Sequence, residues 1–364
     1  MTSRKFRWGI FGTGAISTKF IAGLETARDA EVVFVASRTL ARAQQFVAGV
    51  GCGRPVEGYL ESARLGGVDA IYIATPPSEH LAHALACIEA GIPVLIEKPM
   101  AMSAADARCI AEAARARSVF AMEAMWTRFL PASTAAREQI AARAIGDVRM
   151  VSGDFGTSQR PELSNGMFNP QLGGGALAHL GAYPISLGQW LFGEPIDVQA
   201  MGTIGATGVD EVVSFQLRYP KDVIGSFQVS LRAWGTDGFH VMGTHGVLAF
   251  RGTIVRPHGL QISSEQPRGY DEAKFGWRDR MRQNAFVHRL AQQLDRSGRG
   301  TGRRQPHHYA GNGYHYQMDE VRACIERGDL ESKTMPLGDS IAVAATADRI
   351  RACITGERRS GSTA

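Results

Sequence analysis

A lysine that follows an apolar run is the first residue in this sequence that is placed for chemistry. Residues 93–97 predict a buried strand, and the chain continues through Lys98 and Pro99. In a doubly wound sheet, ligands bind at the carboxyl ends of the strands, which is where Lys98 would lie. An ammonium group there can hold a substrate oxygen and stabilise alkoxide character on it. The alternative is a surface pair of Lys98 with Glu97, which the buried run before them disfavours.

A glycine turn near the N-terminus has the pattern of a dinucleotide-binding loop. Residues 6–11 predict a strand, and the turn and helix start that follow are Gly12, Thr13, Gly14, Ala15 and Ile16. The first glycine permits a tight turn, the second lets the backbone approach a pyrophosphate, and the helix N-terminus offers N–H groups to the phosphates. Ser17 replaces the usual third glycine and is still small enough for close packing. The alternative is a glycine turn that binds no dinucleotide.

The end of the second predicted strand bears on the choice between NAD and NADP. A site for NAD usually has an acidic residue here, which binds the ribose hydroxyls. This sequence has Ser37 and Arg38 instead. A hydroxyl and a guanidinium suit a 2′-phosphate, because arginine combines a permanent charge with a planar fork of donors. We therefore predict NADP rather than NAD; the alternative is that Arg38 is a solvated residue in an exposed turn.

Alternating strands and helices would position these residues, and the first third of the sequence has this alternation. Through about Met122, short apolar strands alternate with helical patterns, which predicts an α/β fold with a Rossmann-type, doubly wound parallel sheet. The predicted strands are 6–11, 31–36, 69–75, 93–97 and 119–122, and the predicted helices are 17–26, 40–50, 78–90 and 104–117.

After a helix near residues 130–143, the rhythm changes to successive strands. These are 148–155, 198–204, 211–219, 223–232, 239–242 and 247–251, with a helix at 176–192 and two more at 315–327 and 339–353. This order predicts an α+β domain with a large, mostly antiparallel sheet. We place a dinucleotide-binding domain at residues 1–124 and a substrate-binding domain at 125–364, whose terminal helices are free to pack back on the first.

Length, charge and cysteines limit the possible functions. The 364 residues suffice for two domains, and a net charge of +5 suits an anionic cofactor but does not indicate nucleic acid. The basic run 296–304 contains several glycines and predicts an exposed loop. Five scattered cysteines without a CxxC pair predict neither a disulfide framework nor a metal site. No signal-peptide or membrane-span pattern is present, so we expect a cytoplasmic protein that does not bind membranes.

Several motifs together resemble the glucose–fructose oxidoreductase, inositol dehydrogenase and MocA (Gfo/Idh/MocA) family over nearly the whole chain. They are Gly12-x-Gly14, Thr75-Pro76 followed by His80, Glu97-Lys98-Pro99, and Gly173-Gly174-Gly175-Ala176-Leu177. Residues 123–131 and 311–316 are similar to the branch that contains trans-dihydrodiol dehydrogenases and NADP-dependent D-xylose dehydrogenases. The resemblance implies that Lys98 is the catalytic lysine. It also implies that the residues near the nicotinamide include Thr75, Pro76, His80, Glu97 and Pro99, and that an open-faced second sheet forms at least a homodimer.

One departure from the family pattern falls on the helix that carries the acid/base. The usual run is Gly-Gly-Gly-Ala-Leu-x-Asp-x-Gly-x-Tyr; here His179 replaces the aspartate and Tyr183 is retained. Residues four apart share a helix face, so both rings can reach one cleft. Tyrosine ionises near pH ~10, and the Lys98 ammonium is expected to lower that pKa. His179 can accept or relay the proton. The alternatives are a structural histidine and a core tyrosine bonded to backbone.

These residues predict an NAD(P)-dependent dehydrogenase with the catalytic residues Lys98, Tyr183 and His179. The predicted reaction moves a hydride between NADP and a hydroxyl-bearing carbon of a sugar, polyol or cyclic trans-diol. Trp126 and Arg128 either form a wall and an anchor for a hydroxylated ring or pack the junction between the domains. Two other hypotheses remain: an NADP-binding sensor without turnover, and an enzyme whose tightly held cofactor is reduced and reoxidised in place.

Overall fold

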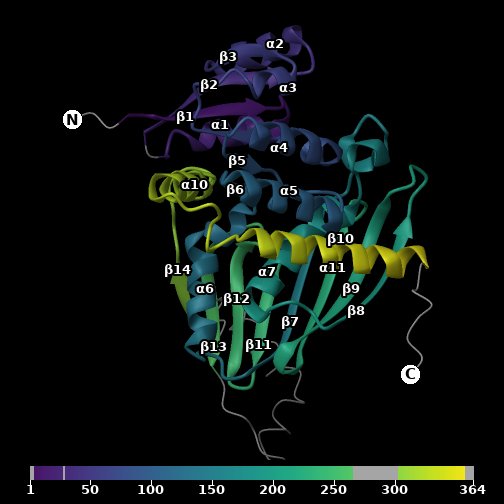
Figure 1. Cartoon of the computed structure of the whole chain (residues 1–364). Coiled ribbons are helices and arrows are strands. Elements are labelled where there is room, and N and C mark those ends of the chain that lie inside the picture. The colour runs from purple at the N-terminus through teal and green to yellow at the C-terminus, as the bar shows by residue number, and fades with distance from the viewer. Residues whose placement is uncertain (1–3, 28, 265–301, 357–364) are drawn as a thin grey trace, which may run out of the picture.

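The computed structural model describes residues 4–27, 29–264 and 302–356. It contains two β-sheets, which lie one above the other in Figure 1. The long helix α11 (Leu337–Thr355) runs across the junction between them and packs against α5 on one side and against α7 and β8 on the other. Among the described residues, no helix is long and apolar enough to cross a bilayer.

The first sheet has six parallel strands in the order β3-β2-β1-β4-β5-β6. Their bounds are β1 (Phe6–Phe11), β2 (Ala30–Ser37), β3 (Arg54–Glu57), β4 (Ala70–Ile73), β5 (Val94–Ile96) and β6 (Ala121–Glu123). The winding direction reverses between β1 and β4, which creates the crevice where such sheets bind dinucleotides. The predicted Rossmann topology is confirmed, although β3 was not predicted because its charged ends and Pro55 do not alternate like a strand.

Helices cover both faces of this sheet. The face with Trp8 packs against α1 (Ala15–Gly23), α2 (Leu40–Val50) and α10 (His315–Arg327). The opposite face, with Ile71, packs against α3 (Tyr59–Ser62), α4 (His80–Glu89) and α5 (Ala104–Arg117). Helix α10, from the end of the chain, therefore contributes to the core of the first sheet.

The second sheet has eight strands in the order β14-β13-β12-β11-β7-β10-β9-β8, antiparallel except for the pair β7/β10. The strands are β7 (Val148–Gly156), β8 (Asp197–Ile204), β9 (Asp210–Tyr219), β10 (Val223–Ser230), β11 (Phe239–Gly243), β12 (Gly246–Thr253), β13 (Arg256–Ser264) and β14 (Arg303–Pro306). The predicted fold class, α/β followed by a mostly antiparallel α+β unit, is confirmed.

Helices cover one face of the second sheet. Apolar side chains that alternate along β9, such as Phe215 and Leu217, meet α6 (Pro131–Ala141) and α7 (Ala182–Phe192) in one core. Figure 1 shows both helices on the same side of the strands. Side chains of the other face, including Val212 and Ile224, are exposed. Short helical turns complete the fold: η1 (Pro77–Glu79), η2 (Trp126–Phe129), η3 (Gly166–Phe168), η4 (Pro170–Leu172), η5 (Leu177–Gly181) and η6 (Pro220–Asp222).

The helical segment predicted at 176–192 is confirmed, although its first part, η5, is a π-helical turn that leads directly into α7. One prediction about the second half was wrong. The run 296–304 was predicted as an exposed loop, but Arg303 and Arg304 belong to the edge strand β14, while 296–301 lie outside the described residues. Charged residues suit an edge strand because they oppose pairing with other chains, and a strand with such a sequence does not show an apolar alternation.

Candidate active site

The glycine turn connects β1 to α1, beside the reversal point of the first sheet. Gly12 has a φ of +107°, and any side chain there would collide with the carbonyl group of Ala74, so the position requires glycine. Gly14 caps α1, and a Cβ atom built on it would meet no atom within 4 Å. Buried Ser17 donates its hydroxyl to the Gly12 carbonyl at 2.9 Å and so braces the turn. Open space above a helix N-terminus fits a bound pyrophosphate.

Two cations and two hydroxyls meet where β2 ends. Ser37 is buried, Arg38 is exposed, and Arg42 follows in the first turn of α2. Tyr59 reaches them from α3: burial raises its pKa, whereas a hydrogen bond with Ser37 and the charges of Arg38 and Arg42 lower it. Glu57, the register partner of Ser37 on β3, is exposed. Sequence reasoning found Ser37 and Arg38 but missed Arg42 and Tyr59, which depend on helix geometry and on an unpredicted strand.

Two histidines of α4 hold the loop that follows β4. The ring of fully buried His80 lies between two carbonyls, with Nε2 2.9 Å from that of Thr75 and Nδ1 2.9 Å from that of Pro99. Burial lowers the pKa of His80 to about 4. The nearby Pro76 caps the N-terminus of η1, and His83, which was not predicted, has Nδ1 3.0 Å from the Thr75 hydroxyl. Both ring nitrogens of His80 face the main chain, so its side chain braces the loop of Thr75 and Pro99, and its place near the nicotinamide stays a prediction.

Lys98 reaches from the end of β5 to the helical segment of the second half. Its Nζ atom donates to the carbonyl of His179 at 2.7 Å and lies 5.1 Å from the ring centroid of Tyr183. Burial lowers the pKa of Lys98, while the carboxyl groups of Glu97 and Glu123 oppose that shift. The lysine is therefore a half-buried cation that contacts the main chain of His179 and the ring of Tyr183.

Two buried carboxyl groups lie beneath this lysine. Glu97 accepts hydrogen bonds from the Tyr72 hydroxyl and from the Lys98 amide. Glu123 accepts one from the Met100 amide at 2.9 Å. Burial raises the pKa of both glutamates, and the charge of Lys98 counteracts it. Glu97 thus supports Lys98 from inside the sheet, and Tyr72, which sequence reasoning read as an ordinary core residue, is its hydrogen-bond donor.

The π-helical turn η5 carries His179. Its start is fixed by Asp210, whose carboxylate accepts from the Leu177 amide at 2.6 Å. Burial lowers the pKa of His179 to about 3, and the charges of Lys98 and His80 contribute to the same direction. The imidazole is therefore neutral near pH 7. Its Nε2 atom is buried and has no hydrogen-bond partner among the described residues. Such an atom is costly unless a ligand satisfies it, and π-helical turns occur often at functional sites.

Tyr183 follows in the first turn of α7. Its hydroxyl oxygen accepts a hydrogen bond from Trp126 Nε1 at 3.3 Å, and its ring meets Phe155 edge-on. Burial raises the pKa of Tyr183, and the negative charge of Glu97 adds to the rise. The expectation that Lys98 lowers this pKa is therefore wrong in direction, because burial outweighs the neighbouring ammonium. Tyr183 is a neutral phenol whose oxygen already has one donor.

The neighbours Trp126 and Arg128 turn out to have different surroundings. Trp126 stacks on Tyr314 with ring centroids 4.7 Å apart and forms a wall beside Tyr183. Arg128 is 0% exposed and donates to the Ser186 hydroxyl and carbonyl, the Thr334 carbonyl and Asp339. The reading of Arg128 as a substrate anchor is thus corrected to junction packing. Both lie on η2, and residues two apart in a 3₁₀ turn point to different sides.

Comparisons with known proteins agree with this geometry. A family model described as an oxidoreductase family with an NAD-binding Rossmann fold matches residues 6–125, and the GFO/IDH/MocA C-terminal domain matches residues 133–249. Trans-1,2-dihydrobenzene-1,2-diol dehydrogenase of Mus musculus is 33% identical over 354 residues, which cover 96% of each chain.

Two solved structures share the fold. A 3-ketoreductase from Actinomadura kijaniata, in complex with NADP and TDP-benzene, has a TM-score of 0.79 at 21% identity, covering 96% of this chain and 98% of that chain. A levoglucosan dehydrogenase in complex with NADH and levoglucosan has a TM-score of 0.79 at 20% identity, covering 98% of each.

The fold and the glycine turn define a nicotinamide-dependent oxidoreductase. The chain belongs to the glucose–fructose oxidoreductase, inositol dehydrogenase and MocA family. The predictions of the family, of an enzyme and of a nicotinamide dinucleotide are thereby confirmed. Within the described ranges, no group of three or more acidic, histidine or cysteine side chains is arranged to hold a metal ion.

Proposed function

We propose that the enzyme transfers a hydride between NADP and a hydroxyl-bearing carbon of a sugar, polyol or cyclic trans-diol. The observation that carries the proposal is the convergence of Lys98, Tyr183 and the partnerless Nε2 atom of His179 at the carboxyl end of β5. An ammonium, a phenol and a neutral imidazole can all bind hydroxyl oxygens. The substrate class is supported by the name of the mouse relative, a trans-1,2-dihydrobenzene-1,2-diol dehydrogenase, and by the levoglucosan bound to one structural neighbour.

The preference for NADP is supported by the end of β2. Ser37, Arg38 and Arg42 can together bind a 2′-phosphate. The nearby acidic residue Glu57, the register partner of Ser37 on β3, is exposed. The pyrophosphate would lie over the N-terminus of α1, where Thr13, Ala15 and Ile16 surround open Gly14. Neighbours bind NADP in one structure and NADH in another, so the preference depends on these residues.

Each side chain has a separate role at the reacting carbon. When bound, the nicotinamide supplies or accepts the hydride. The Tyr183 oxygen already accepts a hydrogen bond from Trp126, so its O–H is free to donate a proton to the substrate carbonyl oxygen as the hydride is delivered; in the reverse direction the phenolate takes up the hydroxyl proton. Lys98 stabilises negative charge on the substrate oxygen, and neutral His179 holds a further hydroxyl through Nε2. The stacked rings of Trp126 and Tyr314 provide an apolar wall for the ring of the substrate.

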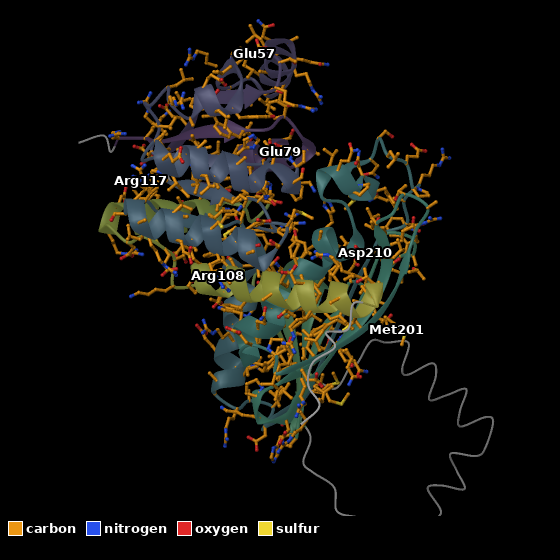
Figure 2. All side chains as sticks on the ribbon, turned by 45° about the vertical axis from the view of Figure 1, so that its right-hand side comes forward. Glu57, Glu79, Arg108, Arg117, Met201 and Asp210 are labelled. Atoms are coloured by element: carbon orange, nitrogen blue, oxygen red, sulfur yellow. The ribbon has the colours of Figure 1, made fainter. Side chains whose placement is uncertain are left out.

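We further propose a homodimer and a division of the chain at residues 124 and 125. The uncovered face of the second sheet supports the dimer, because the register neighbours Ile224 and Met150 are exposed there, as is Val212 farther along the strands. Met201, at the outer strand β8, is 75% exposed and projects from the edge of that sheet in Figure 2. A cytoplasmic location is proposed from the cysteines, all five of which are free.

One spectrophotometric panel tests the function. The purified protein is mixed with NADP or NAD and with aldoses, inositols and trans-dihydrodiols, and nicotinamide reduction is followed. Turnover with NADP and at least one of these classes is expected. Binding of NADP without any turnover would instead favour the sensor hypothesis, which the replacement of the family aspartate by His179 motivates. Equal or better use of NAD would contradict the assignment of Ser37 and Arg38.

The catalytic assignment has a separate test. Lys98→Met retains the length of the side chain but removes its charge, so turnover is expected to fall by orders of magnitude while NADP still binds. Fluorescence of bound NADPH reports the binding, and Arg108→Met, on the exposed surface of α5, is the matched control. Near-normal turnover of Lys98→Met would overturn the mechanism.

A further inference from the structure

A pocket outside the proposed active site is lined by residues that the proposed mechanism does not use. It has a volume of about 360 Å³ and lies where β13 begins and where the chain leaves β14. The described residues that line it are Arg256, His258, His308, Tyr309 and Gly311. This end of the sheet faces the first sheet, as Figure 1 shows from the approach of β14 to α10.

The pocket brings together one cation and two imidazole groups. Arg256, His258 and His308 are all exposed, and the two imidazole rings are almost parallel, with centroids 6.5 Å apart and planes at 5°. Arg256 donates one bond, from Nη2 to the Gly311 carbonyl at 3.1 Å, out of five N–H groups that an arginine offers. None of the described lining residues is acidic. One guanidinium and two imidazoles without a carboxylate fit an oxyanion, which gains charge-assisted hydrogen bonds from them.

Short contacts connect this pocket to the catalytic wall. A Cβ atom built on Gly313 would meet both Tyr309, at 3.1 Å, and Trp126, at 3.4 Å. The opposite edge of the same indole donates to the hydroxyl of Tyr183. Residue Val255, just before Arg256, accepts a hydrogen bond through its carbonyl from Thr127 of η2. Tyr309 and Trp126 therefore connect the pocket to Tyr183 of the proposed active site.

We propose that Arg256, His258 and His308 form a subsite for an anionic group carried by the substrate. The group is a phosphate or a carboxylate, so the substrate is an acidic derivative of a hydroxylated ring, such as a sugar phosphate or a sugar acid. This inference rests on the proposed function for the reacting carbon. The binding of an anion by the pocket is a separate physical claim, because it needs no turnover.

Binding is tested first, on protein saturated with NADP so that the dinucleotide site is occupied. Inorganic phosphate is titrated by calorimetry into the wild type and into the variants Arg256→Gln and His308→Gln. We expect saturable binding that weakens about tenfold in Arg256→Gln, because a charge-assisted contact is lost. The matched control is Arg108→Gln on α5, on the opposite face of the first sheet and labelled in Figure 2. Absence of saturable binding, or equal binding by Arg256→Gln, would overturn the subsite.

Turnover then identifies the anion. The ratio kcat/KM is compared for glucose, glucose 6-phosphate and glucuronate with NADP. We expect at least one of the two acidic substrates to exceed glucose about tenfold, and Arg256→Gln to remove that advantage without altering the value for glucose or the KM for NADP. A preference for the phosphate or for the carboxylate distinguishes the two chemistries. Phosphate binding that depends on Arg256, together with no turnover of any compound, would refute the proposed function while leaving the subsite intact.

Discussion

Replacing Arg128 separates a structural role from a role in substrate binding. The variant Arg128→Met keeps most of the side-chain volume but removes every donor of a guanidinium that is 0% exposed. The carbonyls of Ser186 and Thr334 then lose a buried partner, at about 1–3 kcal/mol each. Asp339 has a side chain that is 36% exposed, so it is rehydrated and adds little. Because the Ser186 hydroxyl also loses its donor, we expect a total loss of about 3–5 kcal/mol.

The assay is equilibrium unfolding in urea, read beside steady-state kinetics. The free energy of unfolding should fall by about 3–5 kcal/mol, while KM for the substrate under native conditions changes less than about twofold. Arg108→Met, which removes an exposed arginine from α5, should alter the unfolding free energy by less than about 0.5 kcal/mol. If Arg128→Met instead raised KM more than tenfold with its stability unchanged, Arg128 would bind substrate and the junction assignment would be wrong.

Three further predictions follow from the site. Tyr183→Phe removes the proposed proton donor, so kcat should fall by roughly 10²–10⁴-fold while NADPH fluorescence still reports binding; unchanged kcat would exclude that role. Gly12→Ala forces a strained φ of +107° and a clash with Ala74, so dinucleotide affinity should be lost. Burial depresses the pKa of His80 to about 4, so protons favour the unfolded chain below the unfolded pKa of about 6.5. Stability should therefore fall from about pH 6.5 towards pH 4, and this slope should flatten in His80→Gln.

Local patterns predicted most of the first sheet because its strands are apolar and its turns contain glycine. Helices 40–50 and 104–117 have the predicted bounds, and the glycine turn lies where the pattern required it. Strands β3, β13 and β14 escaped prediction, and the two at sheet edges, β3 and β14, did so for a common reason. β3 and β14 are short, carry charged residues and pair on one side, so hydrogen bonding to a neighbour, rather than an apolar alternation, makes them strands.

The positions of the site residues were predictable from the sequence, but their protonation states and surroundings were less so. Lys98 was placed by the strand before it, and His179 and Tyr183 were placed by their spacing on a helix. Their protonation depends on how deeply the packed chain buries them, which spacing does not encode. The same holds for Arg128, whose sequence neighbours gave no sign that Ser186 and Thr334 would enclose it.

The π-helical turn explains how a histidine can stand where the family has an aspartate. Lys98 donates to the main-chain carbonyl of residue 179, so this contact does not depend on the side chain at that position. A carboxylate there would add a negative charge beside the lysine, whereas a buried neutral imidazole adds none. The substitution therefore leaves Lys98 in place and changes the charge that the substrate meets. Because a neutral imidazole can donate or accept, we propose that the partnerless Nε2 atom selects the hydroxyl geometry that binds, with catalysis assigned to Lys98 and Tyr183.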